Sequence, residues 1–229
     1  MAVTEPKKNH YSDTFDEGFS TVPHYLAYPR MRPFVGCRYA GAKARILLVG
    51  ESHYLPKNQT LHLDAQRWYQ GQEGDFRPGQ GLGWIHTREI LNKSTGEWRK
   101  QGHAIYRNLD RALYEAGFQS GDSALEHIAF MNGFQRPARE RLSLEVAPED
   151  IEVGRETLAA VIDILRPDGV IFVSRKAARH LSGELKVPHG SVPHPASAWW
   201  NRASRRGTGK TSLFSKCPGF VPVRRAHEL

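Results

Sequence analysis

The sequence predicts an α/β protein, organised as a three-layer α/β/α sandwich around a mostly parallel four-stranded sheet. Short, continuous runs of apolar residues rich in Ile, Leu and Val are typical of strands buried on both faces. Segments with helical periodicity separate these runs, and such alternation is typical of right-handed β-α-β units. The four expected strands are Ile46–Gly50, His127–Asn132, Gly169–Val173 and Val187–Val192.

Two longer helices are expected between these strands. Ala104–Ala116 carries its apolar residues on one face, and Gly117 suits the position after the helix end. Pro148 suits a first helical turn, acidic residues follow it, and Pro167 ends the segment. Shorter helices are expected at about 85–91 and 177–181.

The 229 residues fit one domain with appendages. Residues 1–33 are predicted to be an irregular lead-in that packs over one edge of the sheet. Residues 34–229 are predicted to form a single α/β domain. Within it, residues 55–84 read as a long Gly/Gln-rich loop with interspersed aromatic residues, and 201–229 as a basic C-terminal segment. A loop of this length is usually functional.

The net charge of +8 and the pI near 9.6 favour an anionic partner, nucleic acid first. Ordinary solubility charge is the alternative explanation. No stretch approaches the roughly 18 to 20 apolar residues that a membrane span needs. Cys37 and Cys217 are the only cysteines, so a reducing cytoplasm is the expected compartment. Separately, we expect a monomer.

No metal site or cofactor site is expected. The chain has no H-E-x-x-H motif and no cysteine pair at zinc spacing. Gly207–Thr211 is similar to a phosphate-binding loop, but the first glycine of that motif would fall at Ser204. No strong strand precedes it, so we reject this interpretation.

Polar side chains follow three of the predicted strands. Gly50 ends the first strand, and Glu51, Ser52, His53 and Tyr54 come directly after it; Asn132 and His194 follow two others. In an open parallel sheet these strand ends meet at one edge, where ligands bind. The sequence therefore predicts one crevice that holds a carboxylate, an amide and an imidazole. Taken singly, each residue has a structural alternative, such as capping a strand or a turn.

The order and spacing of these motifs resemble the uracil-DNA glycosylase superfamily, from about Ile46 to Trp200, with an insertion between about Leu55 and Trp84. The most specific part runs from Asn132 through Arg136-Pro137 to Pro148–Arg155 and then His194-Pro195-Ala196-Ser197. The nearest branch is the iron-sulfur type, family 4, whose first motif is Gly-Glu-Ala-Pro-Gly and whose last motif begins His-Pro. This chain lacks the four cysteines of that branch, so no cluster is expected.

The resemblance implies a role for each strand-end residue. His194 would donate a hydrogen bond to uracil O2, Asn132 would pair with the O4 and N3 edge, and Glu51 would position a water. Gly50, Ser52, His53 and Tyr54 would line the base site. Ser52 stands where a second branch has its catalytic aspartate, His53 replaces a proline, and Tyr54 matches a tyrosine that excludes thymine. Phe76 or Trp84 would stack on the flipped base.

The loop after His194 stands where the superfamily inserts a loop into the duplex. Trp199 and Trp200 would wedge the base stack, with Ser197 in the same loop. Arg202, Arg205 and Arg206 would hold flanking phosphates.

The expected function is excision of uracil or a related deaminated base from DNA, without a cofactor. One alternative is a catalytically inactive nucleic-acid-binding member of the same fold, which Ser52 and His53 favour. Another is a hydrolase of free nucleosides.

Overall fold

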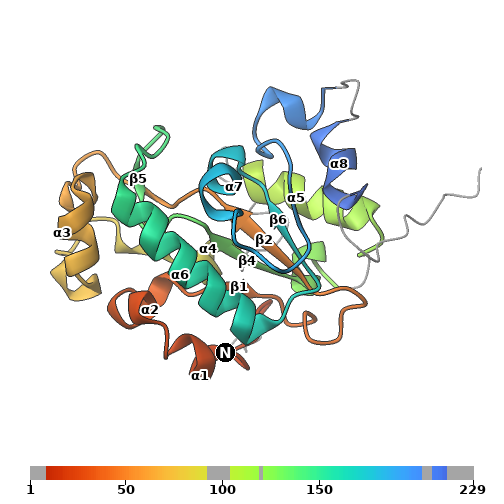
Figure 1. Cartoon of the computed structure of the whole chain (residues 1–229), viewed down its shortest axis with the longest axis horizontal. Helices are drawn as coiled ribbons and strands as arrows, with labels where there is room; N and C mark the ends of the chain where they lie inside the picture. Colours follow the sequence, from red (N-terminus) through yellow and green to blue (C-terminus); the bar gives the residue numbers. More distant parts are fainter. Residues whose placement is uncertain (1–8, 92–103, 119–120, 203–207, 216–229) are drawn as a thin grey trace, which may run out of the picture.

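The computed structural model describes residues 9–91, 104–118, 121–202 and 208–215 (Figure 1). Within them, five strands form one sheet in the order β1-β4-β2-β6-β7. The strands are β1 (Phe34–Val35), β2 (Ile46–Gly50), β4 (Ile128–Asn132), β6 (Gly169–Phe172) and β7 (His189–Ser191). Only β1 runs antiparallel to its neighbour. The α/β class with a mostly parallel sheet is confirmed. The prediction of four strands is wrong, because the sheet has a fifth strand, β1, at its edge. With two residues, β1 is too short to show a strand pattern.

The central strand β2 is buried along its whole length. Leu47 and Val49 face one core cluster, whereas Ile46 and Leu48 face the other. Apolar residues are therefore needed at every position of this strand, which is why it reads as a continuous apolar run.

Helices cover both faces of the sheet. One face carries α6 (Pro148–Leu165), α7 (Arg175–Leu181) and the short helices α1 (Asp16–Phe19) and α2 (Pro23–Ala27). The other face carries α5 (Ala104–Glu115) and α8 (Gly209–Ser215). The two longer helices begin and end close to the predicted positions. No helix among the described residues is long and apolar enough to cross a bilayer.

The sequence predicted an irregular N-terminal segment, but part of this segment is helical. Residues 16–31 form α1, α2 and a 3-10 turn, Pro29–Met31. Phe19, Tyr25 and Tyr28 are fully buried against the core. Helices of four or five residues show no periodicity, and such short helices depend on tertiary packing for stability.

The Gly/Gln-rich segment is also more ordered than predicted. β3 (Tyr54–Leu55) pairs in parallel with β5 (Ala138–Arg139) to form a second, two-stranded sheet. The chain then forms the 3-10 turn η2 (Leu61–Leu63), helix α3 (Ala65–Gln70), and two more 3-10 turns, η3 (Glu73–Asp75) and η4 (Leu82–Ile85), before α4 (Thr87–Leu91). In Figure 1, α3 lies at the far left of the molecule, beside β5.

Trp68 anchors this appendage. Its indole is fully buried and stacks on Tyr28, with 4.3 Å between ring centroids. Trp68 Nε1 donates a hydrogen bond to the carbonyl of Gln135 at 3.1 Å, and the Tyr28 hydroxyl donates to the Trp68 carbonyl at 2.8 Å. One aromatic side chain therefore joins the N-terminal helices, α3 and the segment after β4.

Candidate functional site

The ends of four neighbouring strands meet at one edge of the sheet. Gly50, the last residue of β2, is the register partner of Asn132, the last residue of β4. Beyond the strands the two chains stay side by side: Gly133 N donates to Gly50 O at 3.1 Å, and Phe134 N donates to Glu51 O at 2.9 Å. On the other side, β6 pairs in parallel with β2, and β7 pairs in parallel with β6. The predicted meeting of the strand ends is confirmed.

The side-chain amide of Asn132 makes no hydrogen bond to another described residue. The residue as a whole is 7 % exposed, and neither amide atom is among the fully enclosed polar atoms without a partner, so solvent reaches the amide. The amide is therefore free to pair with the hydrogen-bonding edge of a bound group.

Glu51 is held by a network of donors. Its Oε1 accepts hydrogen bonds from the Ser143 hydroxyl at 2.7 Å and from Leu144 N at 3.3 Å. Its Oε2 accepts one from the Ser174 hydroxyl at 3.2 Å, and Lys176 Nζ lies 3.4 Å from Oε1. Partial burial would raise the pKa of Glu51, but these donors and the Lys176 charge outweigh burial and hold that pKa below its usual value. Glu51 is therefore a fixed anion.

His194 is a neutral hydrogen-bond donor near this anion. Ala196 N donates to Nδ1 of the ring at 3.3 Å, so the ring proton resides on Nε2. Burial lowers the pKa of His194, while the charge of Glu51 acts in the opposite direction and raises it. The backbone beyond it is fixed because Asn108 Nδ2 donates to the carbonyl of Pro195 at 2.8 Å.

Two exposed aromatic residues lie beside this edge. Tyr54 is exposed on β3, and both burial of part of its ring and the charge of Glu51 raise the pKa of its hydroxyl. Trp84 is exposed on η4, which packs against β3. Ser52, between Glu51 and the β3 strand, is half-buried.

His53 and Phe76 do not face this edge, contrary to expectation. His53 is 4 % exposed, and its Nε2 lies 3.0 Å from the Thr87 hydroxyl. Phe76 is partly buried and packs edge-on against Trp68, with ring centroids 6.2 Å apart, at the border of the core. His53 and Leu55 are buried whereas Tyr54 between them is exposed, because neighbouring side chains of a strand lie on opposite sides.

The two adjacent tryptophans have opposite environments. Trp199 is 57 % exposed, and the Arg202 guanidinium lies 5.5 Å from the centre of its ring. Trp200 is 1 % exposed and belongs to the core on the α5 face, so its predicted contact with DNA is wrong. Ser197 is half-buried, and its hydroxyl is enclosed without a partner. Arg205 and Arg206 lie outside the described residues.

Three residues of this site were not anticipated. Ser174 directly follows the predicted strand Gly169–Val173. The argument that polar residues after strand ends gather at one edge would therefore have identified Ser174. Ser143 and Lys176 carry no sequence signal, since only the fold brings them to Glu51.

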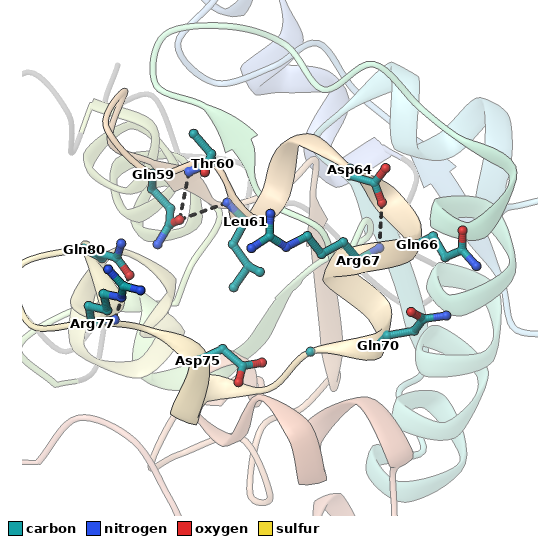
Figure 2. A pocket seen from close by; sticks show the side chains of 11 residues that line it. Gln59, Thr60, Leu61, Asp64, Gln66, Arg67, Gln70, Asp75, Arg77 and Gln80 are labelled. Carbon is teal, nitrogen blue, oxygen red and sulfur yellow. Dashed lines mark hydrogen bonds between the residues drawn. The ribbon is translucent and has the colours of Figure 1, made fainter.

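A wide hollow of about 960 Å³ lies elsewhere, along the Gly/Gln-rich segment (Figure 2). Residues between Gln59 and Gln80 line it, whereas Glu51, Asn132 and His194 do not.

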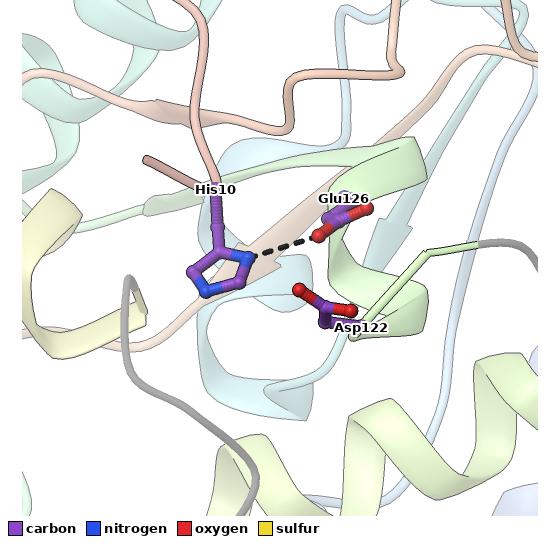
Figure 3. Close-up of side chains that lie close together, drawn as sticks. All are labelled: His10, Asp122 and Glu126. Atoms are coloured by element: carbon purple, nitrogen blue, oxygen red, sulfur yellow. Dashed lines mark hydrogen bonds and ion pairs between the residues drawn. The ribbon is translucent and has the colours of Figure 1, made fainter. Parts of the chain in front are cut away.

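His10, Asp122 and Glu126 form a cluster with potential metal-ligand atoms within 4.8 Å of one another (Figure 3). Glu126 is buried, and its two oxygens already have partners: His10 Nδ1 at 2.9 Å and Arg38 Nε at 3.0 Å. The cluster precedes β4, at the opposite edge of the sheet from Asn132. It acts as an ion-pair network that attaches the N-terminal segment.

No family model matches the chain, and no curated protein matches it either.

Proposed function

We propose that this protein excises uracil or a related deaminated base from DNA, and that its fold is of the uracil-DNA glycosylase type. The observation that carries the proposal is the side-chain amide of Asn132, which has no hydrogen-bond partner among the described residues and lies in register with Gly50 on the neighbouring strand. An amide offers one donor group and one acceptor, which can pair with the O4 and N3–H edge of uracil when the NH2 group faces O4.

His194 supplies the second element. Cleavage of an N-glycosidic bond leaves negative charge on the base, and a donor aimed at the developing oxyanion stabilises the transition state more than the ground state. The Nε2–H of His194 is such a donor, and its neutral state follows from the Ala196 N–H on Nδ1 and from the lowered pKa.

Glu51 acts as a fixed negative charge in this proposal. Its lowered pKa makes Glu51 a weak base, so it is poorly suited to abstract a proton from water. A carboxylate held by Ser143, Ser174 and Lys176 can stabilise the positive charge that develops on the sugar.

The surface around the site suits a nucleic-acid strand. Tyr54, Trp84 and Trp199 expose aromatic surface on which bases can stack, and Arg202 lies over Trp199. A base in a duplex must first be extruded, at a cost of a few kcal/mol. We assign Trp199 to the space that the extruded base leaves in the stack.

A non-catalytic nucleic-acid-binding protein is the second candidate. The 960 Å³ hollow favours it, because Gln59–Gln80 line that hollow and the proposed catalytic residues do not. His53 replaces a proline of the family's first motif and is buried, which also favours the non-catalytic candidate.

A gel assay separates the candidates. Single- and double-stranded oligonucleotides containing uracil, hypoxanthine or xanthine are incubated with the wild type, His194→Ala, Asn132→Leu and a matched control, His189→Ala, which changes an exposed histidine on β7. We expect alkali-labile abasic product from the wild type and the control, and a loss of at least about 100-fold in the two site variants.

The other outcomes select among the alternatives. No product from any base, with binding intact, leaves the non-catalytic candidate. Release of base from free nucleosides alone, with a rate insensitive to salt, indicates a nucleoside hydrolase and refutes action on DNA.

A further inference from the structure

The hollow along the Gly/Gln-rich segment has a polar lining. Four glutamines, Gln59, Gln66, Gln70 and Gln80, line it together with Arg67 and Arg77. Among the described lining residues, Leu61 has the only apolar side chain, and no lining residue is aromatic. Its volume of about 960 Å³ is within the size range of ligand sites. A lining of this kind favours a polar, oxygen-rich occupant over an apolar one.

Gln59 places an unpaired donor at this hollow. The residue is 3 % exposed, and its Oε1 accepts hydrogen bonds from Thr60 N at 2.8 Å and Leu61 N at 2.9 Å. These two bonds determine which end of the amide is the oxygen. The Nε2 end is enclosed and has no partner, and Figure 2 shows it turned away from Thr60 and Leu61 towards the Gln80 side. A buried donor of this kind requires an acceptor.

Two cations border the same hollow. The Arg67 guanidinium extends from α3 across it in Figure 2, and Arg77 lies on the opposite side, next to Gln80. Neither guanidinium has a hydrogen-bond or ion-pair partner among the described residues.

The two carboxylates at the hollow are already engaged. Asp64 accepts a hydrogen bond from Arg67 N at 2.7 Å, and Asp75 accepts one from Gln72 N at 2.8 Å. Both cap local backbone turns, and their charges balance those of the two arginines. The buried group that lacks a partner is a donor, and the two guanidinium groups are donors as well, so the hollow can bind an occupant that presents acceptor oxygens.

We propose that this hollow binds the phosphate backbone of the nucleic-acid strand, on one side of the base site. This inference rests on the proposed function in that both place a strand on the protein. Gln59 follows Tyr54 by five residues, so the two lie within about 18 Å. The axial rise of B-form DNA is about 3.4 Å per nucleotide, so a strand whose base reaches Asn132 needs only a few more nucleotides to reach the hollow. Phosphate oxygens can accept from the exposed Arg67 and Arg77, and from Gln59 once its enclosed Nε2 turns towards the hollow, without base stacking.

The test measures strand binding independently of excision. Fluorescence anisotropy follows fluorescein-labelled thymidine oligonucleotides of 4, 8 and 12 nucleotides, which contain no uracil, at several salt concentrations. Longer strands should bind more tightly to the wild type. Arg67→Gln/Arg77→Gln should weaken binding of the 12-mer about tenfold, lower the slope of log affinity against log salt by about 1.4, and abolish the gain from length.

Two further variants sharpen the test. Gln59→Glu keeps an acceptor for Thr60 N and Leu61 N but replaces the free donor with an anion, so it should weaken the 12-mer and not the 4-mer. Lys43→Gln/Arg111→Gln is the matched control. It makes the same change in net charge at the amino end of β2 and on α5, and it should leave affinity and slope as in the wild type.

The outcomes distinguish the two proposals. If abasic product forms but the arginine pair and the control pair behave alike, the hollow is not a strand site and the proposed function survives. If no product forms but the length dependence and its loss are seen, the strand site stands and excision fails. Inorganic phosphate and thymidine monophosphate are tested as competitors. Tight binding of either, with the same arginine dependence and no dependence on strand length, would overturn the strand in favour of a small phosphorylated ligand.

Discussion

The side-chain amide of Asn132 occupies the space beside Gly50 that any Cβ would need. A Cβ built on Gly50 would lie 2.4 Å from Asn132 Oδ1 and 2.9 Å from the Phe130 ring. The two residues are register partners on adjacent parallel strands. The glycine at the end of β2 therefore allows the amide on β4 to reach the edge of the sheet.

Gly50→Ala should displace the Asn132 amide. Contacts under 3.0 Å force movement of a packed strand end, so we expect a loss of about 1–3 kcal/mol in the free energy of unfolding, together with loss of base excision. Chemical denaturation and the gel assay measure the two effects. Gly41→Ala is the control, because a Cβ there meets nothing within 4 Å. Full activity in Gly50→Ala would contradict the assigned role of Asn132.

The titration of His194 should reveal the charge of Glu51. Burial lowers the pKa of His194 below its ordinary value of 6.5, and Glu51 raises it. We expect an NMR midpoint below 6.5 for the wild type and a still lower midpoint for Glu51→Gln. Glu145→Gln, which removes an exposed carboxylate near Ser143, is the control. A higher midpoint in Glu51→Gln would show that the two side chains do not interact as described.

His53 should make the native state sensitive to acid. Burial, with a smaller contribution from His86, lowers its pKa from 6.5 to about 3. The unfolded chain therefore takes up the proton first, and the stability present above pH 6.5 is lost as the pH falls towards 3.

The variant that tests this effect is His53→Gln, which can still bond the Thr87 hydroxyl. It should reduce the slope of unfolding free energy against pH by about 1.4 kcal/mol per unit between pH values of about 4 and 6. Urea denaturation at a series of pH values measures the slope, with His189→Gln as control. An unchanged slope would refute the buried neutral state.

Asp150 should be a large contributor to stability. It is fully buried and accepts hydrogen bonds from Arg136 Nε at 2.9 Å, Arg136 Nη2 at 2.6 Å and the Tyr69 hydroxyl at 2.8 Å. Asp150→Asn leaves the Arg136 charge uncompensated, so we expect a loss of about 3–5 kcal/mol. Asp163→Asn, exposed on the same helix, should change stability by less than about 0.5 kcal/mol. Equal effects in thermal denaturation would contradict this assignment.

The adjacent tryptophans should separate binding from stability. Trp199→Ala removes an exposed ring, so it should weaken DNA binding in the anisotropy assay and leave unfolding unchanged. Trp200→Ala empties a buried position and should cost about 3–5 kcal/mol. The reverse pattern would mean that Trp200 contacts DNA and Trp199 supports the fold.

Long elements with a continuous pattern could be predicted from the sequence. β2 and β4 each begin with four consecutive apolar residues, and α6 runs over 18 residues with a proline at its start. Their burial on one or both faces shows directly in the choice of residues. Parallel pairing follows from the alternation of strands and helices, and it brings Asn132 to Gly50.

Short elements could not be predicted. β1, β3 and β5 have two residues each, and α1 and α2 have four and five, too few to show a period. Trp68 reads as a loop aromatic, yet its contacts with Tyr28 and Gln135 make it the anchor of α3. Such partners lie 40 and 67 positions away in the chain.

The amino-acid pattern alone established the α/β class, the central strands and the edge at which their polar ends gather. The tertiary structure decided which of those polar groups face a ligand: Asn132 unpaired, Glu51 held by Ser143 and Lys176, and His53 turned towards Thr87. Local periodicity records burial, because each residue responds to its own surroundings. The direction of one side chain beyond a strand end depends on partners that only long-range packing supplies.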